Sequence, residues 1–502
     1  MEASALRYLD SKAPAEDLEL LLWPAGGELI AQTRQNHDVL SKAHSVLIQR
    51  IPLPELRRAQ RQVIGHDNSA MLIGTGHQTE LYHPGVWVKD VLIDVLAGKL
   101  GGQAVHIAVD TDGPKHLLLR FPGEAEPITD DPRVNEVPWS GLVLAPTPRH
   151  IEHLRRVFLQ ASVGWNFTSQ VPEFLGSMQR QVLRQPTLAC ALTSSMGELD
   201  RSLGLRCRCL LASGLFCSEP YLVFVHHLLG RAEEFLRDYN AALHEFRISQ
   251  GIKSVGQPMP DLEFSTELCE VPFWLDNLES GTRTRAKLRR ANSVWALECE
   301  GRDGFVFNPG VEGWAAAQGL KRWLTEHRLR LSPRALTLTM FLRLVLCDQF
   351  VHGIGGGRYD QVTDVLVARH FRMEAPRFSI TTATLHFPGA AGRRRASVTE
   401  VIHQGHHLRH GLLGEEKTEF LRQIQSLPRR SSRRRAVFLD MHERLRAAPG
   451  DHPALRAWEE QLRQTMEQAR EDRLFFDREL FCAIQPRNRL EAMIDRYQAA
   501  LR

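Results

Sequence analysis

Hydrophobic and polar positions follow two different periods along the first part of the chain. Over residues 1–65 the apolar positions form stripes at helical spacing, as at Leu40, Leu47 and Ile51, which predicts an N-terminal helical segment. A short apolar run follows at 70–73 and ends in Gly74-Thr75-Gly76. That pattern is typical of a buried strand stopped by a tight turn.

The next 35 residues complete a compact unit. Apolar positions recur at helical spacing over 86–100, Gly101-Gly102 ends the predicted helix, and 104–109 is rich in strand formers. Strand, turn, helix and strand within about 40 residues indicate a βαβ unit, which normally belongs to a parallel sheet. We therefore expect an α/β fold that binds its ligand at the carboxyl ends of the strands, where segments 74–83 and 110–116 fall.

The remaining pattern divides the chain further. We expect the first half of the sheet core at 66–150, mostly helical insertions and connecting elements at 151–330, and the second half of the core, with a glycine-rich turn, at 331–390. The region 391–502 is predicted to be basic and helical. Its loose apolar stripe is typical of packing on the parent domain or on a second subunit: Leu455, Trp458, Leu462 and Met466.

Composition narrows the class of protein. A chain of 502 residues is too long for one simple core. Its net charge of +4 is small for this length and does not indicate nucleic-acid binding. Basic runs at 393–395 and 429–435 are typical of solvated loops, with phosphate or RNA binding as the alternative. No signal peptide and no apolar stretch of about 20 residues is visible, so we expect a cytoplasmic protein without a membrane partner.

The eight cysteines do not form a metal or redox motif. Cys207 and Cys209 are separated by one residue, which is the wrong spacing for a zinc knuckle or a redox pair. Four others, Cys190, Cys269, Cys299 and Cys347, stand among apolar residues and are interpreted as buried, reduced thiols.

The turn GTGHQTELYHPG is the first candidate for chemistry. Gly74 and Gly76 would let the backbone turn sharply and approach a ligand, with His77 just past the strand end. His83 precedes Pro84 at the start of a helix, whose free amides attract anions. The alternative is a helix start with two exposed polar histidines.

The turn AVDTDGPKH is the second candidate. If the strand alternation continues, Asp110 and Asp112 point the same way and could orient a nucleophile, act as a general base or hold a divalent ion. Lys115 and His116 supply donors nearby. The alternative is an Asp-Gly-Pro turn in which Asp112 binds local amides.

The third candidate is the glycine-rich turn in FVHGIGGGRYDQVTD. Four glycines within 353–357, ahead of a helix, could bind a phosphate or carboxylate through backbone amides. The turn is neither a P-loop nor a dinucleotide fingerprint. Close packing of the backbone is the alternative.

Two histidine clusters need separate interpretations. His403, His406, His407 and His410 would share one helix face and could bind a metal, but Gly405 is expected to interrupt that helix, so a solvated face is the preferred interpretation and no metal site is predicted. His226 and His227 lie in an apolar helical stretch and are interpreted as structural.

These segments resemble the bacillithiol synthase family, the cysteine-adding ligases of bacillithiol biosynthesis. The matching segments, in the family's order, are GHQTELYHPGVWVKD, AVHIAVDTD, SPRALTLTMFLRLVLCDQFVHGIGGGRYD and ELFCAIQPRNRLEAMI. The glycine-rich turn departs from the family's pattern of Gly-Pro followed by Glu-x-x-Tyr, and the acidic cluster is shorter. The chain is thus similar to a divergent member with another substrate.

The resemblance implies a Rossmann-like parallel sheet core with helical insertions, and a C-terminal, coiled-coil-like helical arm that forms a homodimer. It implies a ligase that condenses an amino acid, with cysteine as one candidate, with an amine-bearing sugar or small molecule. The expected catalytic residues are His77, His83, Asp110 and Asp112. The expected substrate-binding residues are Gly76, Gln78, Lys89, Lys115, Arg343, Asp348, Gly353, Gly355, Gly356, Gly357, Tyr359 and Asp360.

Two other functions remain open. His83-Pro84-Gly85-Val86 imitates three positions of the His-x-Gly-His turn of nucleotidyltransferases, although Val86 replaces the final histidine. The other is a dimeric binding protein that keeps the fold without catalysis. The sequence leaves the cofactor open, with ATP or another nucleotide as candidates, and gives no reason to expect a nucleic-acid partner.

Overall fold

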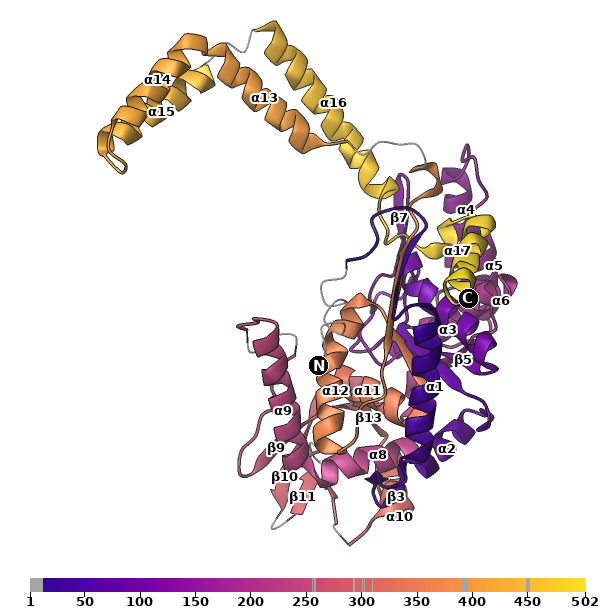
Figure 1. Ribbon diagram of the computed structural model, residues 1–502. Helices are drawn as coiled ribbons and strands as arrows, with labels where there is room; N and C mark the ends of the chain where they lie inside the picture. The colour runs from indigo at the N-terminus through magenta and orange to yellow at the C-terminus, as the bar shows by residue number, and fades with distance from the viewer. Residues whose placement is uncertain are drawn as a thin grey trace. The chain divides into compact units, whose positions relative to one another are not determined.

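The computed structural model describes residues 12–254, 256, 259–291, 294–299, 301, 303–308, 310–390, 396–447 and 452–502. These residues form two compact units (Figure 1). The first contains 12–385 together with Arg478–Arg502, and the second contains His386–Asp477. The basic run at 393–395 lies outside the described residues.

A six-stranded mixed sheet forms the centre of the first unit. Its order is β1 (Glu19–Trp23), β15 (Ser379–Thr384), β14 (Gln349–His352), β4 (Leu72–Gln78), β5 (Gln103–Val109) and β8 (Arg208–Leu211). The last five strands are mutually parallel, and β1 pairs antiparallel with β15. The predicted α/β class is confirmed, as is the βαβ unit formed by β4, α3 (Pro84–Leu100) and β5.

Chain order reverses between β4 and β14. From β4 the chain proceeds through α3 to β5 and then to β8, whereas the later strand β14 lies on the other side of β4 and continues through α12 (Ile354–His370) to β15. Because crossovers between parallel strands are right-handed, helices of connections that run in opposite directions cover opposite faces. Figure 1 shows α3 and α12 on either side of the sheet.

The glycines of β4 do not form the predicted turn. The strand continues through Gly74 and Gly76 to Gln78. A Cβ atom on Gly74 would lie 2.4 Å from the sulfur of Cys347, and one on Gly76 would lie 3.2 Å from the carbonyl oxygen of Ile107. These glycines therefore allow neighbouring segments to pack closely against the strand.

The N-terminal region and the middle of the chain contain strands that the pattern did not predict. Residues 1–65 were expected to be helical, yet β1 precedes α1 (Gly26–Lys42), the short strands β2 (Leu47–Ile48) and β3 (Ile51–Pro52), and α2 (Leu53–Val63). Within 151–330 and just beyond, a second, antiparallel sheet has the order β12 (Phe305–Val306), β11 (Val294–Leu297), β10 (Thr282–Ala291), β9 (Leu268–Asn277) and β13 (Leu329–Pro333).

Helices make up most of the remaining first unit. They are α4 (Pro148–Ala161), α5 (Val171–Gln181), α6 (Leu188–Ser202), α7 (Ala212–Leu215), α8 (Glu219–Gly230), α9 (Ala232–Ser249), α10 (Gly313–Glu326), α11 (Ala335–Phe341), a π-helical turn η2 (Leu342–Leu346) and α17 (Arg487–Ala500). A hairpin of β6 (Leu118–Phe121) and β7 (Glu124–Pro127) follows β5. No described helix is both long enough and apolar enough to cross a membrane.

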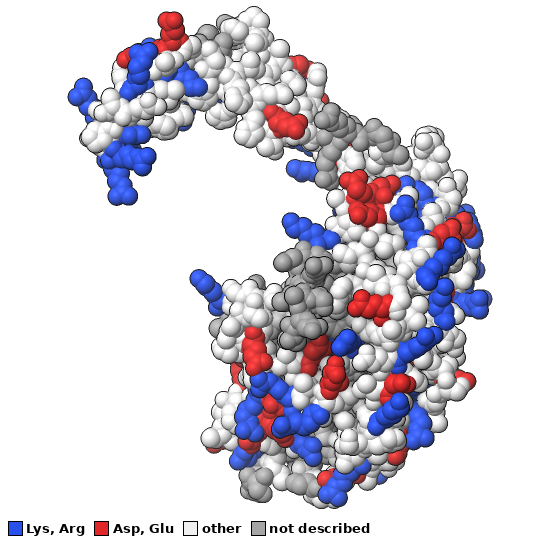
Figure 2. Space-filling model, in the orientation of Figure 1, with Lys and Arg blue, Asp and Glu red and all other residues white. Residues whose placement is uncertain are grey.

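The second unit consists of paired helices. Helix α13 (Val398–Leu412) packs on α16 (Pro453–Phe475), and α14 (Gly414–Ser426) packs on α15 (Ser432–Ala447). Gly405 does not interrupt α13, contrary to the prediction. Lys and Arg side chains gather at the end of the α14–α15 pair, where the basic run 429–435 connects the two helices (Figure 2).

Candidate active site

A cavity of about 790 Å³ lies at the carboxyl ends of β4 and β5. Its wall combines the end of β4 and the following turn with the segment after β5, and two residues of the C-terminal part return to complete it. The lining residues are His77, Gln78, Glu80, Leu81, His83, Pro114, Lys115, His116, Leu117, Leu118, Arg120, Pro127, Thr129, Val134, Asn135, Glu479 and Phe481. The cavity therefore lies at the carboxyl edge of the parallel strands, where ligands bind in open α/β sheets, and β4 is one of the two strands between which the strand order reverses.

Glu80 is the most unusual group in this wall. Its side chain is only 3% exposed, and Oε2 has no hydrogen-bond partner among the described residues. Burial raises the pKa of Glu80 from 4.5 to about 7, although Lys89 and Lys115 oppose the shift. A carboxyl group with that pKa can accept a proton near neutral pH.

His77 lies beside this carboxyl group. Its Nδ1 atom is 3.3 Å from Glu80 Oε1. Burial lowers the pKa of His77 well below its usual value, and the charge of Lys89 lowers it further. The imidazole is therefore neutral at physiological pH and can donate one hydrogen bond.

His83 caps helix α3. Its Nδ1 atom accepts a hydrogen bond from the backbone N–H of Gly85, at 3.1 Å. Burial lowers its pKa to about 3, helped by the positive charge of Arg478. The ring is neutral with Nδ1 occupied, so Nε2 carries the proton and is the atom available to a ligand.

Lys89 lies beneath the pair of His77 and Glu80 rather than in the cavity wall. Its ammonium group donates to the carbonyl oxygen of Gly76, at 2.8 Å. Burial lowers the pKa of Lys89 to about 8, although Asp90 and Glu80 favour the charged form. Lys89 was expected to bind substrate, but its ammonium group contacts the backbone, and the residue is not among those that line the cavity.

A buried polar chain supports the same wall. The Tyr82 hydroxyl lies 3.0 Å from His106 Nε2, and His106 Nδ1 lies 2.6 Å from Asp90 Oδ1. The Tyr82 ring packs edge-on against His77. Sequence reasoning missed His106 and Asp90 because each belongs to an apolar strand or helix pattern, and Tyr82 because it lies in the turn between β4 and α3.

Asp110 and Asp112 make separate sets of contacts in the structure. Strand β5 ends at Val109, so the alternation of a strand does not extend to them. Asp110 is buried and accepts from the backbone N–H and the hydroxyl of Ser213, at 2.9 and 2.5 Å, at the start of α7. Asp112 accepts from the side-chain amide of Gln78 and the N–H of Gly113. From the Asp-Gly-Pro-Lys-His segment, the described residues that line the cavity are Pro114, Lys115 and His116.

The glycine-rich turn has a mixed role. Gly353 caps α12, and it follows β14 at the same edge of the sheet as His77, since Val351 pairs with Thr75. A Cβ atom on Gly357 would lie 2.4 Å from Ile380, and one on Gly356 would lie 2.9 Å from the His352 ring. Close packing thus accounts for these two glycines. A Cβ atom added to Gly353 or Gly355 would meet no atom within 4 Å, so close packing does not account for these two. None of the turn's residues lines the 790 Å³ cavity.

The charged residues predicted to bind substrate near this turn are held in buried networks. Arg343 is 2.6 Å from Asp360, which also contacts His352 at 2.9 Å. Although burial raises the pKa of Asp360, the charges of Arg343 and His352 and the hydrogen bonds to the carboxylate together outweigh it, and the pKa is well below its usual range. Asp348 lies at the amino end of β4, where it accepts from the N–H of Leu72. Tyr359 is exposed.

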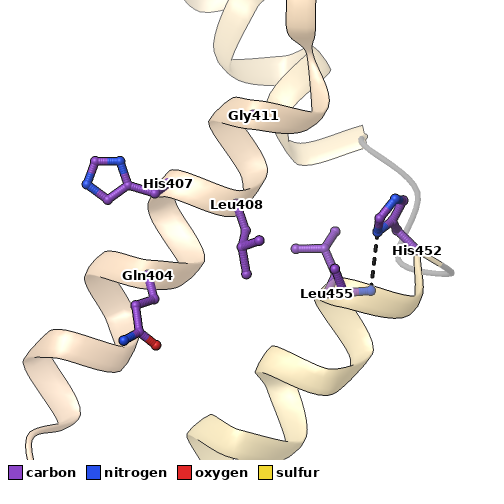
Figure 3. Close-up of a pocket in the computed structure, with 7 residues that line it drawn as sticks. Gln404, His407, Leu408, Gly411, His452 and Leu455 are labelled. Atoms are coloured by element: carbon purple, nitrogen blue, oxygen red, sulfur yellow. Dashed lines mark hydrogen bonds between the residues drawn. The ribbon is translucent and has the colours of Figure 1, made fainter.

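The histidines of α13 are not among the groups of described residues whose possible ligand atoms lie close together. Among the described residues, the group with ligand atoms close enough for an ion is Glu234, Asp238 and His370. A pocket of about 590 Å³ between α13 and α16 is lined by Leu408 and Leu455, which point toward one another, whereas the His407 ring points away (Figure 3). This pocket offers an apolar surface and little chemistry.

No known protein family and no curated protein matches this chain. The site must therefore be interpreted from its own geometry.

Proposed function

We propose that this protein is an amide-forming ligase, similar to bacillithiol synthase, that joins an amino acid to an amine-bearing sugar or small molecule. Cysteine is one candidate for the amino acid. The chain order of the five parallel strands, 5-4-1-2-3, supports a Rossmann-like core, because it matches that topology read from the opposite edge. The cavity beside the order reversal supports a small-molecule site.

The pair of Glu80 and His77 is the observation on which the proposal rests. An amine that attacks an activated carboxylate, such as an acyl phosphate, forms the C–N bond while the bond to the phosphate leaving group breaks. The amine must also lose a proton. The carboxylate of Glu80 would accept that proton, and its pKa of about 7 suits the transfer.

The same wall would hold the anionic groups. Lys115 and Arg120 line the cavity as cations, and the neutral rings of His77 and His83 can donate hydrogen bonds to a phosphoryl or carboxylate oxygen. These donors would stabilise the negative charge that develops on the leaving group.

The helical second unit supports the expected homodimer. It exposes large apolar side chains that a monomer leaves in water, namely Ile402, Leu408, Leu421, Phe438, Leu439 and Met466. Light scattering on the purified full chain should give twice the chain mass. A monomeric mass at micromolar concentration would contradict the dimer without affecting the proposed chemistry.

The activity test uses ATP, a mixture of amino acids and amine acceptors such as glucosamine derivatives, with products identified by mass spectrometry. Amide formation that depends on the amino acid supports the ligase. His77→Ala and Glu80→Gln should each lower the rate at least 100-fold, since general acid–base groups contribute about 10²–10⁴. The matched controls, His153→Ala and Glu152→Gln on the exposed face of α4, should keep full activity.

Two outcomes would contradict the ligase. Pyrophosphate release with a nucleotidyl product, without amide, would indicate a nucleotidyltransferase. Saturable binding of the substrates without any turnover would indicate a binding protein.

A further inference from the structure

A second cavity, of about 300 Å³, lies at the opposite edge of the central sheet. It is bounded by α1, by α2 and by the residue that precedes β14. Asp348, in the wall of this cavity, makes two hydrogen bonds with the backbone of Leu72. The Asp348 N–H donates to the Leu72 carbonyl, and the Asp348 carboxylate accepts from the Leu72 N–H, both at 2.8 Å. Leu72 is the first residue of β4 and Gln78 is the last, so this cavity lies roughly 20 Å from the candidate active site along the strand.

Three arginines of one helix converge on this cavity. Arg57, Arg58 and Arg61 all come from α2, and the side chains of Arg57 and Arg61 are each only 5% exposed. Both side chains are held by the π-helical turn η2, which precedes β14. Arg57 Nη1 donates to the Leu344 carbonyl at 2.5 Å, and Arg61 Nε donates to the Leu346 carbonyl at 2.9 Å. Their guanidinium groups are therefore preorganised.

The positive charge exceeds what the wall neutralises. Asp348 is the one carboxylate among the described lining residues, and it lies 2.7 Å from Arg57 and 2.8 Å from Arg61. Three guanidinium groups and one carboxylate leave two positive charges. Burial lowers the pKa of Arg57 to about 10, and the neighbouring charge of Arg61 adds to the shift. An anion in the cavity would relieve this repulsion.

Buried polar atoms of the wall also lack hydrogen bonds. Arg61 Nη2 is close to Asp348, but it makes no hydrogen bond with the described residues. Asn68 Oδ1, on the segment after α2, is buried and has no described partner. A ligand with both acceptor oxygens and one O–H group would satisfy these two atoms, and a monoprotonated phosphate has both.

We propose that this cavity binds the phosphoryl group of a small phosphorylated molecule or free phosphate. Arginine forks match the oxygen geometry of phosphate. A volume of about 300 Å³ holds a phosphoryl group with a few further atoms. The site lies at the opposite edge from the candidate active site, so it does not depend on the proposed ligase function.

The test is calorimetric titration of the full chain, in a chloride buffer without phosphate, with inorganic phosphate and separately with glycerol 3-phosphate. We expect saturable binding with one site per chain for at least one of them. Tighter binding of the ester would identify a phosphorylated metabolite as the source, and equal or weaker binding would identify the free ion.

Arg58→Gln is the critical variant because Arg58 is exposed and its loss leaves the buried ion pairs in place. The affinity of Arg58→Gln for the phosphate ligand should fall at least fivefold. Asn68→Asp, which adds a negative charge to the wall, should weaken binding of the same ligand at least tenfold. Arg34→Gln, which removes an exposed arginine of α1 outside the cavity wall, should bind like the wild type. Absence of saturable binding, or equal loss in Arg58→Gln and Arg34→Gln, would overturn the proposal.

Discussion

His77 Nδ1 lies 3.3 Å from Glu80 Oε1 at the carboxyl end of β4. The two groups face a cavity whose other charged residues are mainly cationic. Burial disfavours charge on both, so the imidazole stays neutral while the carboxyl group ionises near pH 7. This pair determines the proposed chemistry, and it also has a measurable effect on stability.

Glu80→Gln should change how stability depends on pH. The pKa of Glu80 is raised from 4.5 to about 7, so the folded state binds the proton more tightly than the unfolded state. The protonated Glu80 carboxyl group therefore makes its full contribution to the stability of the fold below pH 4.5, and this contribution is lost as the pH rises through 7. A shift of this size corresponds to about 3 kcal/mol. Between pH 4.5 and pH 8, the free energy of unfolding of Glu80→Gln should therefore rise by up to that amount relative to the wild type, as measured by urea denaturation.

The control for this experiment is Glu152→Gln, since Glu152 is exposed on α4. Its difference from the wild type should stay constant with pH. If Glu80→Gln behaved in the same way, Glu80 would not have the raised pKa on which the proposed proton transfer depends.

Gly357→Ala should destabilise the first unit, whereas Gly355→Ala should not. The added methyl of the first variant would lie 2.4 Å from Ile380, whereas that of the second would meet nothing within 4 Å. Overpacking typically costs about 1–3 kcal/mol. Thermal unfolding of the two variants checks this. Equal melting temperatures would contradict close packing as the reason for Gly357.

Gly405→Ala should destabilise the helical second unit. Its Cβ would lie 2.1 Å from the Trp458 ring, and the indole N–H donates to the Val401 carbonyl at 2.7 Å, which holds the ring in place. Gly411→Ala, on the same helix with open space around it, is the matched control and should gain up to about 1 kcal/mol from helix propensity. Hydrogen exchange over α13 and α16 distinguishes the two, because only Gly405→Ala should lose protection there.

Asp360→Asn should be strongly destabilising. It would leave Arg343 buried with one carboxylate partner fewer, and breaking a buried ion pair typically costs about 3–5 kcal/mol. Glu374→Gln, which breaks the exposed pair with Arg377, should cost less than about 1 kcal/mol. Chemical denaturation at pH 7 measures both. A small effect of Asp360→Asn would indicate that the site is hydrated and open, as a substrate-binding role requires.

The βαβ unit could be predicted because its signals are local. The apolar period over 86–100 and the pair Gly101-Gly102 mark α3 without reference to other segments. Strand β10 gave no such signal, because its sequence TRTRAKLRRA carries charge on half of its positions and, among its described side chains, only Ala286 and Leu288 are buried. Strand β1 was missed because its short apolar run depends on pairing with β15, more than 350 residues later.

The candidate site was predicted in part. His77, Gln78, His83 and Lys115 line one cavity, but Asp110 and the glycine-rich turn, which were expected in the same hollow, do not. Glu80 was missed, since its burial depends on the whole fold, including Glu479 and Phe481, which lie about 400 residues away. Asp348 and Arg343 were expected to bind substrate because of the resemblance to bacillithiol synthase. Their partners within the protein, Arg57 and Asp360, are not adjacent to them in sequence and could not be predicted.

The last helix of the chain has a consequence for biosynthesis. The Tyr497 side chain is fully buried, and its hydroxyl lies 2.5 Å from the hydroxyl of Thr381 on β15. Residues 381 and 497 therefore meet in one unit, while 386–477 fold as a separate body between them in the sequence. All six strands of the central sheet lie within residues 19–384, whereas α17 follows the inserted body. A ribosome must therefore release residues 386–477 before α17 can pack on the first unit, so the inserted helices can form before the domain that carries them is complete.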